Sequence, residues 1–203
     1  MHIAQVLQAA QQNYSARFAP FDQSQLNCPD NKEGVCFALC KIWLNTPDKI
    51  AKIHLAQQFF SENAARANQK QTKYVQKIRS ASGDQVKYKH LKLIATGSKA
   101  HGANFWSETT GQIDVKFDAS KYLLSLSFEG QPGIGHAVAA CNHNGVAYFF
   151  DPNGGILAFG DVDDFSNWLE VEFPTASQSH YDKIFQLKVY MYDKTADYKK
   201  EGT

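Results

Sequence analysis

One stretch in the second half of the chain, residues 133–155, constrains the fold more than any other. Its sequence is GIGHAVAACNHNGVAYFFDPNGG, in which two short apolar segments flank the dipeptide Asn144-Gly145. An Asn-Gly pair tolerates the positive φ angles that a type I′ turn requires, so it predicts a β-hairpin. A hairpin fixes the register of its two strands and therefore fixes which side chains share a face.

The predicted hairpin gives His136 and Asp151 a common face if its loop has two or four residues. With a two-residue loop, residue 143 pairs with 146 and His136 falls opposite 153. With a four-residue loop, His136 lies directly opposite Asp151. Either register allows an imidazole–carboxylate hydrogen bond, whereas a three-residue loop would put the two side chains on opposite faces. The stretch therefore predicts a histidine oriented by a carboxylate.

The length and the net charge of the chain indicate a single domain and give no sign of a nucleic-acid or membrane partner. The 203 residues are enough for one domain with a sizeable core, and a single domain over 1–203 is expected. The formal net charge of +1 gives no reason to expect a nucleic acid or an anionic membrane as partner. No apolar run approaches the length of a membrane span. The N-terminus lacks the basic start and unbroken apolar segment of a signal peptide.

The cysteines do not form a recognisable metal or disulfide pattern. In a chain without a signal peptide, free thiols are expected at all four positions, Cys28, Cys36, Cys40 and Cys141. The pair Cys141-x-His143 supplies only two ligands and no second pair follows, so no metal or other cofactor is expected.

Helical patterns occupy the first part of the chain. Residues 2–16 have the 3–4 apolar spacing of an amphipathic helix. Residues 34–44, GVCFALCKIWL, predict a compact apolar helix, and another is expected to begin at Thr46-Pro47-Asp48 and to reach Arg66 or, with a break, Arg79. We interpret its basic residues as a solvated helix face rather than a binding surface; they are Lys70, Lys73, Lys77 and Arg79.

Strand patterns follow the helices. Residues 18–33 and 97–111 are expected to be loops, 161–173 a helix and 193–203 a frayed tail. Strands are predicted at 86–94, 113–117, 122–128 and 184–192, in addition to the hairpin. Because helices come first and an antiparallel sheet second, the fold class is predicted to be α+β.

Cys36 is the candidate nucleophile. It lies in the first turn of the predicted helix, where the partial positive charge of the helix terminus stabilises a thiolate. A nucleophilic cysteine also needs a base and a group that orients the base, and His136 with Asp151 fits these roles. Cys40 and Cys141 are interpreted as core residues.

Three blocks of the chain resemble the YopT/AvrPphB-type cysteine proteases, bacterial effectors of the papain-like superfamily. These blocks are Gly34-Val35-Cys36-x-x-Leu39-x-x-x-Trp43-Leu44, Gly135-His136-Ala137 and Phe150-Asp151-Pro152-Asn153-x-Gly155. The resemblance implies a papain-like domain with N-terminal helices, carrying the nucleophile, packed on a C-terminal antiparallel sheet. It makes Cys36 the nucleophile, His136 the base and Asp151 its orienter. It further implies a host protein as substrate and delivery into the host cytoplasm by a specialised secretion system; we expect a monomer.

The same resemblance implies an oxyanion hole formed by the backbone N–H of Cys36 and an amide side chain a few residues earlier. Asn31 is the candidate, and Gln25 and Asn27 are alternatives, whereas an ionised Asp30 cannot donate. Two other functions stay open at this point. The same triad would serve a protein-glutamine deamidase, and a non-catalytic binding module could keep the fold. The sequence does not name the substrate.

Overall fold

The strands of this protein form one antiparallel sheet. The computed structural model describes residues 3–31, 34–46, 52–80, 88–102, 104–129, 135–176 and 184–194 of the chain. Within these residues the sheet has seven strands in the order β1-β6-β5-β4-β3-β7-β2. The strands are β1 (Arg17–Pro20), β2 (Leu91–Ser98), β3 (Lys121–Phe128), β4 (Gly135–His143), β5 (Val146–Asp151), β6 (Gly155–Phe159) and β7 (Ile184–Tyr192).

Helices cover both faces of the sheet. The α-helices are α1 (Ile3–Asn13), α2 (Cys36–Leu44), α4 (Ala56–Glu62), α5 (Ala64–Ser80), α6 (Phe105–Thr110), α7 (Val162–Asn167) and α8 (Phe173–Ala176). Shorter helical turns are η1 (Gln23–Gln25), η2 (Ile53–Leu55), η4 (Lys99–His101) and the π-helical η5 (Trp168–Glu172). Among the described residues, no helix is long and apolar enough to cross a bilayer.

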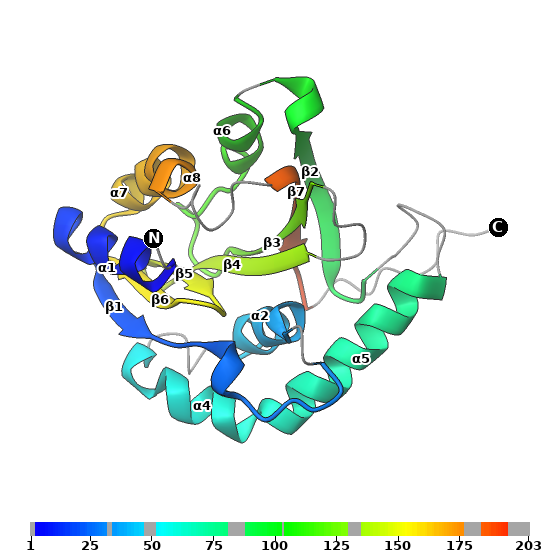
Figure 1. The fold of residues 1–203 in the computed structure, drawn as a ribbon. Helices are drawn as coiled ribbons and strands as arrows, with labels where there is room; N and C mark the ends of the chain where they lie inside the picture. Colours follow the sequence, from blue (N-terminus) through cyan, green and yellow to red (C-terminus); the bar gives the residue numbers. More distant parts are fainter. Residues whose placement is uncertain are drawn as a thin grey trace.

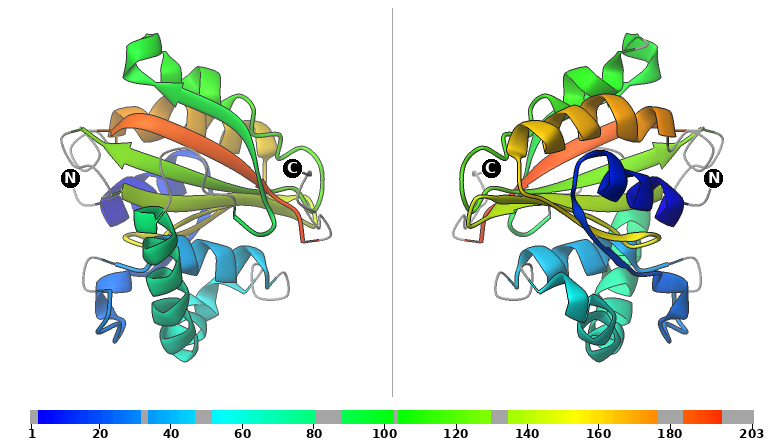
Figure 2. Two further views of the ribbon diagram at one scale, coloured as in Figure 1. Left: turned by 90° about the vertical axis from the view of Figure 1, so that its right-hand side faces the viewer. Right: turned by 90° about the vertical axis from the view of Figure 1, so that its left-hand side faces the viewer.

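The sheet separates two apolar cores. In Figures 1 and 2, α2, α4 and α5 lie on one side of the sheet, and α6, α7 and α8 lie on the other. The first core joins Phe37 and Trp43 of α2 to Phe150 of β5. The second core joins residues of α1, α6 and α7 to the alternate side chains of the same strands, among them Phe149. This alternation is the period of two that a strand with both faces covered requires.

The hairpin has a two-residue turn, one of the loop lengths that the sequence left open. Asn144 and Gly145 have φ angles of 54° and 76°, both positive as a type I′ turn requires. His143 pairs with Val146, and the ladder between β4 and β5 continues to Ala139 opposite Phe150. The four-residue and three-residue alternatives are therefore wrong, and the register that places His136 and Asp151 on one face is confirmed.

Other predicted elements are confirmed with small changes in their ends. The predicted α+β class is present, and β3 and β7 match the predicted strands closely. Helix α7 begins after Asp161, whose carboxylate accepts hydrogen bonds from the N–H groups of Asp163 and Asp164 as an N-cap. The apolar stretch at 34–44 forms α2, which begins at Cys36.

Four segments differ from the prediction. Residues 17–20 and 155–159, not predicted as strands, form β1 and β6, which pair with each other at the edge of the sheet. Residues 97–111 contain the end of β2, η4 and helix α6 instead of a loop. Residues 113–117 form no strand, because Ile113 and Val115 are buried in the second core without pairing in the sheet. Pro47 and Asp48 of the predicted helix start, and most of the predicted tail, lie outside the described residues.

Candidate active site

Cys36 is the first residue of α2 and lies against the sheet. The chain turns into this helix at Gly34, whose φ of +120° is unfavourable for other residues, and Val35 is the N-cap. A Cβ atom at Gly34 would lie 3.1 Å from the amide of Gln23, so the turn also needs a glycine for its close approach. Every residue of α2 except Lys41 is apolar and buried, so packing holds the helix, and with it the Cys36 thiol, in a fixed position.

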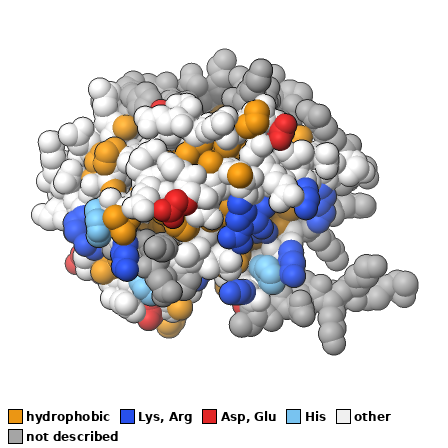
Figure 3. All heavy atoms as spheres, turned by 90° about the horizontal axis from the view of Figure 1, so that it is seen from below, with side chains coloured by type: hydrophobic (Ala, Val, Ile, Leu, Met, Phe, Trp, Pro, Cys, Tyr) orange, Lys and Arg blue, Asp and Glu red, His pale blue; other side chains and the backbone are white. Residues whose placement is uncertain are grey.

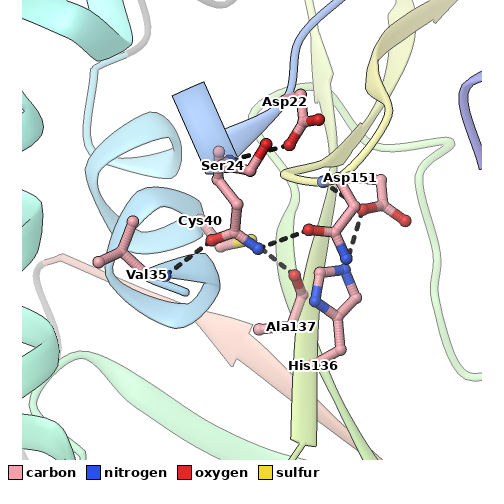
Figure 4. A network of polar contacts seen from close by, with 9 residues as sticks. Asp22, Ser24, Val35, Cys40, His136, Ala137 and Asp151 are labelled. Carbon is pink, nitrogen blue, oxygen red and sulfur yellow. Dashed lines mark hydrogen bonds and ion pairs between the residues drawn. The ribbon is translucent and has the colours of Figure 1, made fainter. Parts of the chain in front are cut away.

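His136 and Asp151 form the hydrogen bond that the hairpin predicts. They lie just beyond the paired part of β4 and β5, and His136 Nε2 is 2.9 Å from Asp151 Oδ1 (Figure 4). The backbone N–H of Asn153 donates to the same carboxylate oxygen at 2.8 Å. Asp151 is fully buried. Because the loop after β5 holds its carboxylate through Asn153, the carboxylate can in turn orient the His136 imidazole.

Charge interactions favour the protonated form of His136. Burial alone would lower the pKa of this imidazole, but the Asp151 carboxylate, through charge and a hydrogen bond, raises it above the ordinary 6.5, and the Cys36 side chain adds to the rise. Because Nε2 donates to Asp151, the ring nitrogen left for the Cys36 thiol is Nδ1.

The start of α2 leaves backbone donors next to the thiol. The first N–H groups of a helix have no partner within it. Gln23 Oε1 accepts from the N–H of Val35 at 2.7 Å, and Gln71 Oε1 accepts from that of Ala38 at 3.1 Å. Among the described residues, no acceptor contacts the N–H groups of Cys36 and Phe37. These two groups are available to an oxyanion formed at the Cys36 thiol.

Gln23, which the sequence analysis did not select, links the two halves of the site. Besides accepting from the N–H of Val35, the side-chain amide of Gln23 donates from Nε2 to Asn153 Oδ1 at 2.6 Å. The backbone N–H of Gln23 donates to the carbonyl of Pro152 at 2.8 Å. The Gln23 side chain therefore ties α2, which begins at Cys36, to the segment that carries the Asp151 carboxylate.

Replacing Gln23 with alanine is expected to lower the free energy of unfolding by about 1–3 kcal/mol, because it leaves the buried N–H of Val35 without an acceptor. Urea unfolding measures the change. The matched control is Gln25→Ala, since Gln25 lies exposed in the same η1 turn and should change stability by less than about 0.5 kcal/mol. Equal effects of the two substitutions would contradict the linking role.

The structure places Asn31 against α5. Its Nδ2 donates to the carbonyl of Asn68 at 2.8 Å, to Asn68 Oδ1 at 2.7 Å and to Thr72 Oγ1 at 3.0 Å. The two N–H groups of this amide are shared among these three acceptors and hold the loop before α2 on the α5 helix. The alternatives Gln25 and Asn27 are exposed. Asn31 can serve as an oxyanion donor only if its amide leaves these acceptors.

The other cysteines lie apart from this chemistry. All four cysteines are free thiols. Cys40 and Cys141 are fully buried, as predicted for core residues, and burial raises the pKa of both thiols. Cys40 donates to the carbonyl of Ala137 at 3.3 Å, which fastens α2 to β4 next to His136. No group of three potential metal ligands occurs within the part of the chain that the structure describes.

A cavity of about 350 Å³ opens beside the start of α2. Its walls come from η1, the loop after it, the turn into α2 and the Asp151 loop, and they include Gln23, Leu26, Asn27, Cys28, Gly34 and Asn153. The cavity therefore borders the segments that position Cys36 and Asp151.

Comparison with known proteins gives the fold and the family. The chain is similar to the Pseudomonas avirulence protein AvrPphB, with a TM-score of 0.65 and 18% identity over 86% of this chain and 96% of that one, which establishes a shared papain-like fold. It also matches PatoxP, a cysteine protease-like domain of the Photorhabdus asymbiotica toxin PaTox, with a TM-score of 0.46 and 11% identity, over 95% of this chain and 58% of that one.

A comparison with curated protein sequences found no match. The profile of the Peptidase_C58 family, described as Yersinia/Haemophilus virulence surface antigen, matches residues 2–194. The predicted resemblance to YopT/AvrPphB-type proteases is thereby confirmed. Since the match covers nearly the whole chain, the protein belongs to the Peptidase_C58 family.

Proposed function

We propose that this protein is a thiol protease that acts on a host protein after delivery into the host cytoplasm, with Cys36 as nucleophile, His136 as base and Asp151 as its orienter. Membership of the Peptidase_C58 family supports a cysteine protease of the virulence-effector type. The observation that carries the assignment of residues is the buried His136, which bonds Asp151 through Nε2 and has the Cys36 side chain as its other partner.

The first half of the reaction forms an acyl-enzyme. The Cys36 thiolate attacks the scissile carbonyl carbon, so a sulfur–carbon bond forms and the carbonyl oxygen takes the negative charge. The N–H of Cys36, with that of Phe37 beside it, donates to this oxyanion. The His136 imidazolium then gives its proton to the leaving nitrogen, the carbon–nitrogen bond breaks, and the amine product departs.

The second half hydrolyses the acyl-enzyme. Neutral His136 takes a proton from a water molecule, whose oxygen attacks the thioester carbon. The carbon–sulfur bond breaks, and the acid product leaves with the thiolate and imidazolium restored. Asp151 keeps the imidazole oriented and stabilises its charged form in both halves. Asn31, which the family resemblance suggests as a second oxyanion donor, is proposed instead to anchor the loop, since its amide already contacts three acceptors on α5.

The test compares the wild-type protein with Cys36→Ala in host-cell lysate. We expect new protein N-termini with the wild type and none with the variant, detected by mass spectrometry of enriched termini. Cys141→Ala is the thiol control, because Cys141 is buried in β4 and has no part in the mechanism. A mass gain of about one unit on a glutamine, without new termini, would replace the protease by a deamidase. No Cys36-dependent change in any protein would overturn catalysis.

A further inference from the structure

Helix α5 presents a row of positive charges to solvent. Its exposed basic residues are spaced four, three and four apart, which puts them on one face of the helix, and its sequence contains no acidic residue. We call these residues, Arg66, Lys70, Lys73 and Lys77, the basic stripe. Figure 3 shows blue side chains gathered on the face of the molecule that carries α4 and α5.

A further lysine from α2 extends the positive charge toward the site. Lys41 donates from Nζ to the carbonyl of Lys89 at 3.0 Å and lies 5.9 Å from the centre of the Phe37 ring. Burial lowers the pKa of Lys41 to about 8, and repulsion from Lys70, Lys77 and Lys89 contributes. The positive charges are thus close enough to raise one another's electrostatic energy.

Three members of the stripe take part in no ion pair within the part of the chain that the structure describes. Among the described residues, the two ion pairs are His136 with Asp151 and Lys116 with Asp163, and neither involves Arg66, Lys70 or Lys73. Like charges held close together repel one another, and a bound anion relieves that repulsion. The stripe is therefore complementary to an acidic ligand.

Aromatic contacts connect the stripe to the nucleophile. Phe37 follows Cys36 in the chain and stacks on Tyr74 of α5, with ring centres 3.8 Å apart and planes at 12°. Tyr74 lies between Lys73 and Lys77 on α5. Burial raises the pKa of Tyr74, with contributions first from Tyr88 and then from the charge of Cys36, so the hydroxyl lies within electrostatic reach of the thiol. The stripe and the candidate nucleophile therefore adjoin.

The sequence alone favours a solvated helix face for these basic residues, but α5 packs beside the start of α2. We propose instead that the basic stripe binds an acidic segment of the substrate protein next to the bond that is attacked. This inference rests on the proposed function, because it names the class of substrate for the same site. An anionic membrane matches the basic stripe less well than an acidic protein segment does. Membrane-binding surfaces insert projecting apolar side chains, whereas Phe37 is buried and the rings of Tyr74 and Tyr88 are only partly exposed.

The first experiment measures binding without catalysis. The probes are a fluorescein-labelled Glu-Ser repeat peptide and a Gln-Ser repeat of equal length, titrated with the Cys36→Ala protein. We expect the acidic peptide to bind about tenfold more tightly at low salt, with the difference lost at high salt. The charge reversal Lys70→Glu with Lys73→Glu should abolish the preference. Equal affinity for the two peptides would overturn the proposal.

The matched control reverses two charges outside the stripe. Lys92→Glu with Lys116→Glu serves this purpose, because Lys92 lies in β2 opposite Met191 and Lys116 pairs with Asp163. This control should keep the preference for the acidic peptide. Loss of the preference in the control as well would mean that net charge, and not the stripe, determines binding, which would also overturn the proposal.

The second experiment uses proteins that keep Cys36, with and without the stripe substitutions, and identifies the sites that they cleave in host-cell lysate. Cleaved sites should be enriched in Asp and Glu near the new termini, and the enrichment should disappear with Lys70→Glu and Lys73→Glu. Cleavage without such enrichment would overturn this inference and leave the protease proposal intact. Binding of the acidic peptide without any cleavage would overturn the protease proposal and leave the binding of an acidic ligand intact. Stripe-dependent binding to phosphatidylserine vesicles, with no peptide preference, would assign the stripe to a membrane and overturn the proposal.

Discussion

Replacing Asp151 with alanine is expected to lower kcat by about 10²- to 10⁴-fold, the range over which an acid–base group contributes to rate. The variant removes both contributions of the carboxylate to His136. It removes the 2.9 Å hydrogen bond that orients the imidazole, and it removes the charge that raises the imidazole pKa. With the carboxylate gone, burial dominates and disfavours the imidazolium that must protonate the leaving amine.

The substitution Asp151→Asn separates the two effects of the carboxylate on His136, namely orientation of the ring and stabilisation of its positive charge. An asparagine oxygen can still accept from His136 Nε2, so the ring stays oriented, but the neutral amide no longer stabilises the imidazolium. The carboxylate raises the pKa of His136, so its removal lowers that pKa, and the proton is lost at a lower pH. We therefore expect a smaller loss of kcat than with alanine, and an alkaline limb of kcat/KM that moves to lower pH.

Two measurements check these expectations. The pH profile of kcat/KM is recorded on a peptide taken from a cleaved lysate protein, and the titration of His136 is followed by NMR, with His136→Gln used to assign its signal. Circular dichroism establishes that each variant is folded, since Asp151 also accepts from the N–H of Asn153. An unchanged pH profile in Asp151→Asn would show that the carboxylate does not act through the charge of His136.

The elements that could be predicted from the sequence are those determined by local chemistry. Asn144-Gly145 fixes a two-residue turn through the φ angles it permits, and this turn alone sets the register that brings His136 near Asp151. Helix α2 was predicted from an apolar block that begins after a glycine, and Gly34 does adopt a positive φ there. Each of these signals lies within a few residues of the structure it produces.

The elements that were missed depend on distant partners. Strand β6 has five buried residues with no alternation, and such a short apolar run does not distinguish a strand from a buried loop. Strand β1 exists because it pairs with β6, some 140 residues later in the chain. Helix α6 has only six residues, too few to show a helical period, and is held by the bond from Trp106 Nε1 to the carbonyl of Leu169 at 2.9 Å.

The same distinction explains the amide side chains before Cys36. Gln23, Gln25 and Asn31 carry the same functional group within a short polar segment, so no local pattern separates them. Only the fold buries Gln23 between α2 and the Asp151 loop and turns Asn31 toward α5. The proposed nucleophile, base and carboxylate could be selected from the sequence because a hairpin and a helix start mark them. The supporting amides of Gln23 and Asn31 could not be assigned their contacts in this way.

Phe150→Ala is expected to lower the free energy of unfolding by about 3–5 kcal/mol, the range for removing a buried aromatic side chain. Phe150 is fully buried, stacks on Phe60 with ring centres 4.6 Å apart, and packs 5.3 Å from the ring of Trp43 in α2. The substitution removes this aromatic contact between the sheet and the nucleophile helix, and the cavity left behind adds to the lost burial.

Urea unfolding at fixed pH measures this loss, and Phe117→Ala is the matched control because Phe117 is 70% exposed and should change stability by less than about 0.5 kcal/mol. Phe150 immediately precedes Asp151, and Trp43 lies in the helix that begins at Cys36. The core that stabilises the fold is therefore also what holds the proposed carboxylate and nucleophile in place. A loss below about 1 kcal/mol would show that α2 packs on the sheet without this aromatic contact, and the fixed geometry of the site would need another cause.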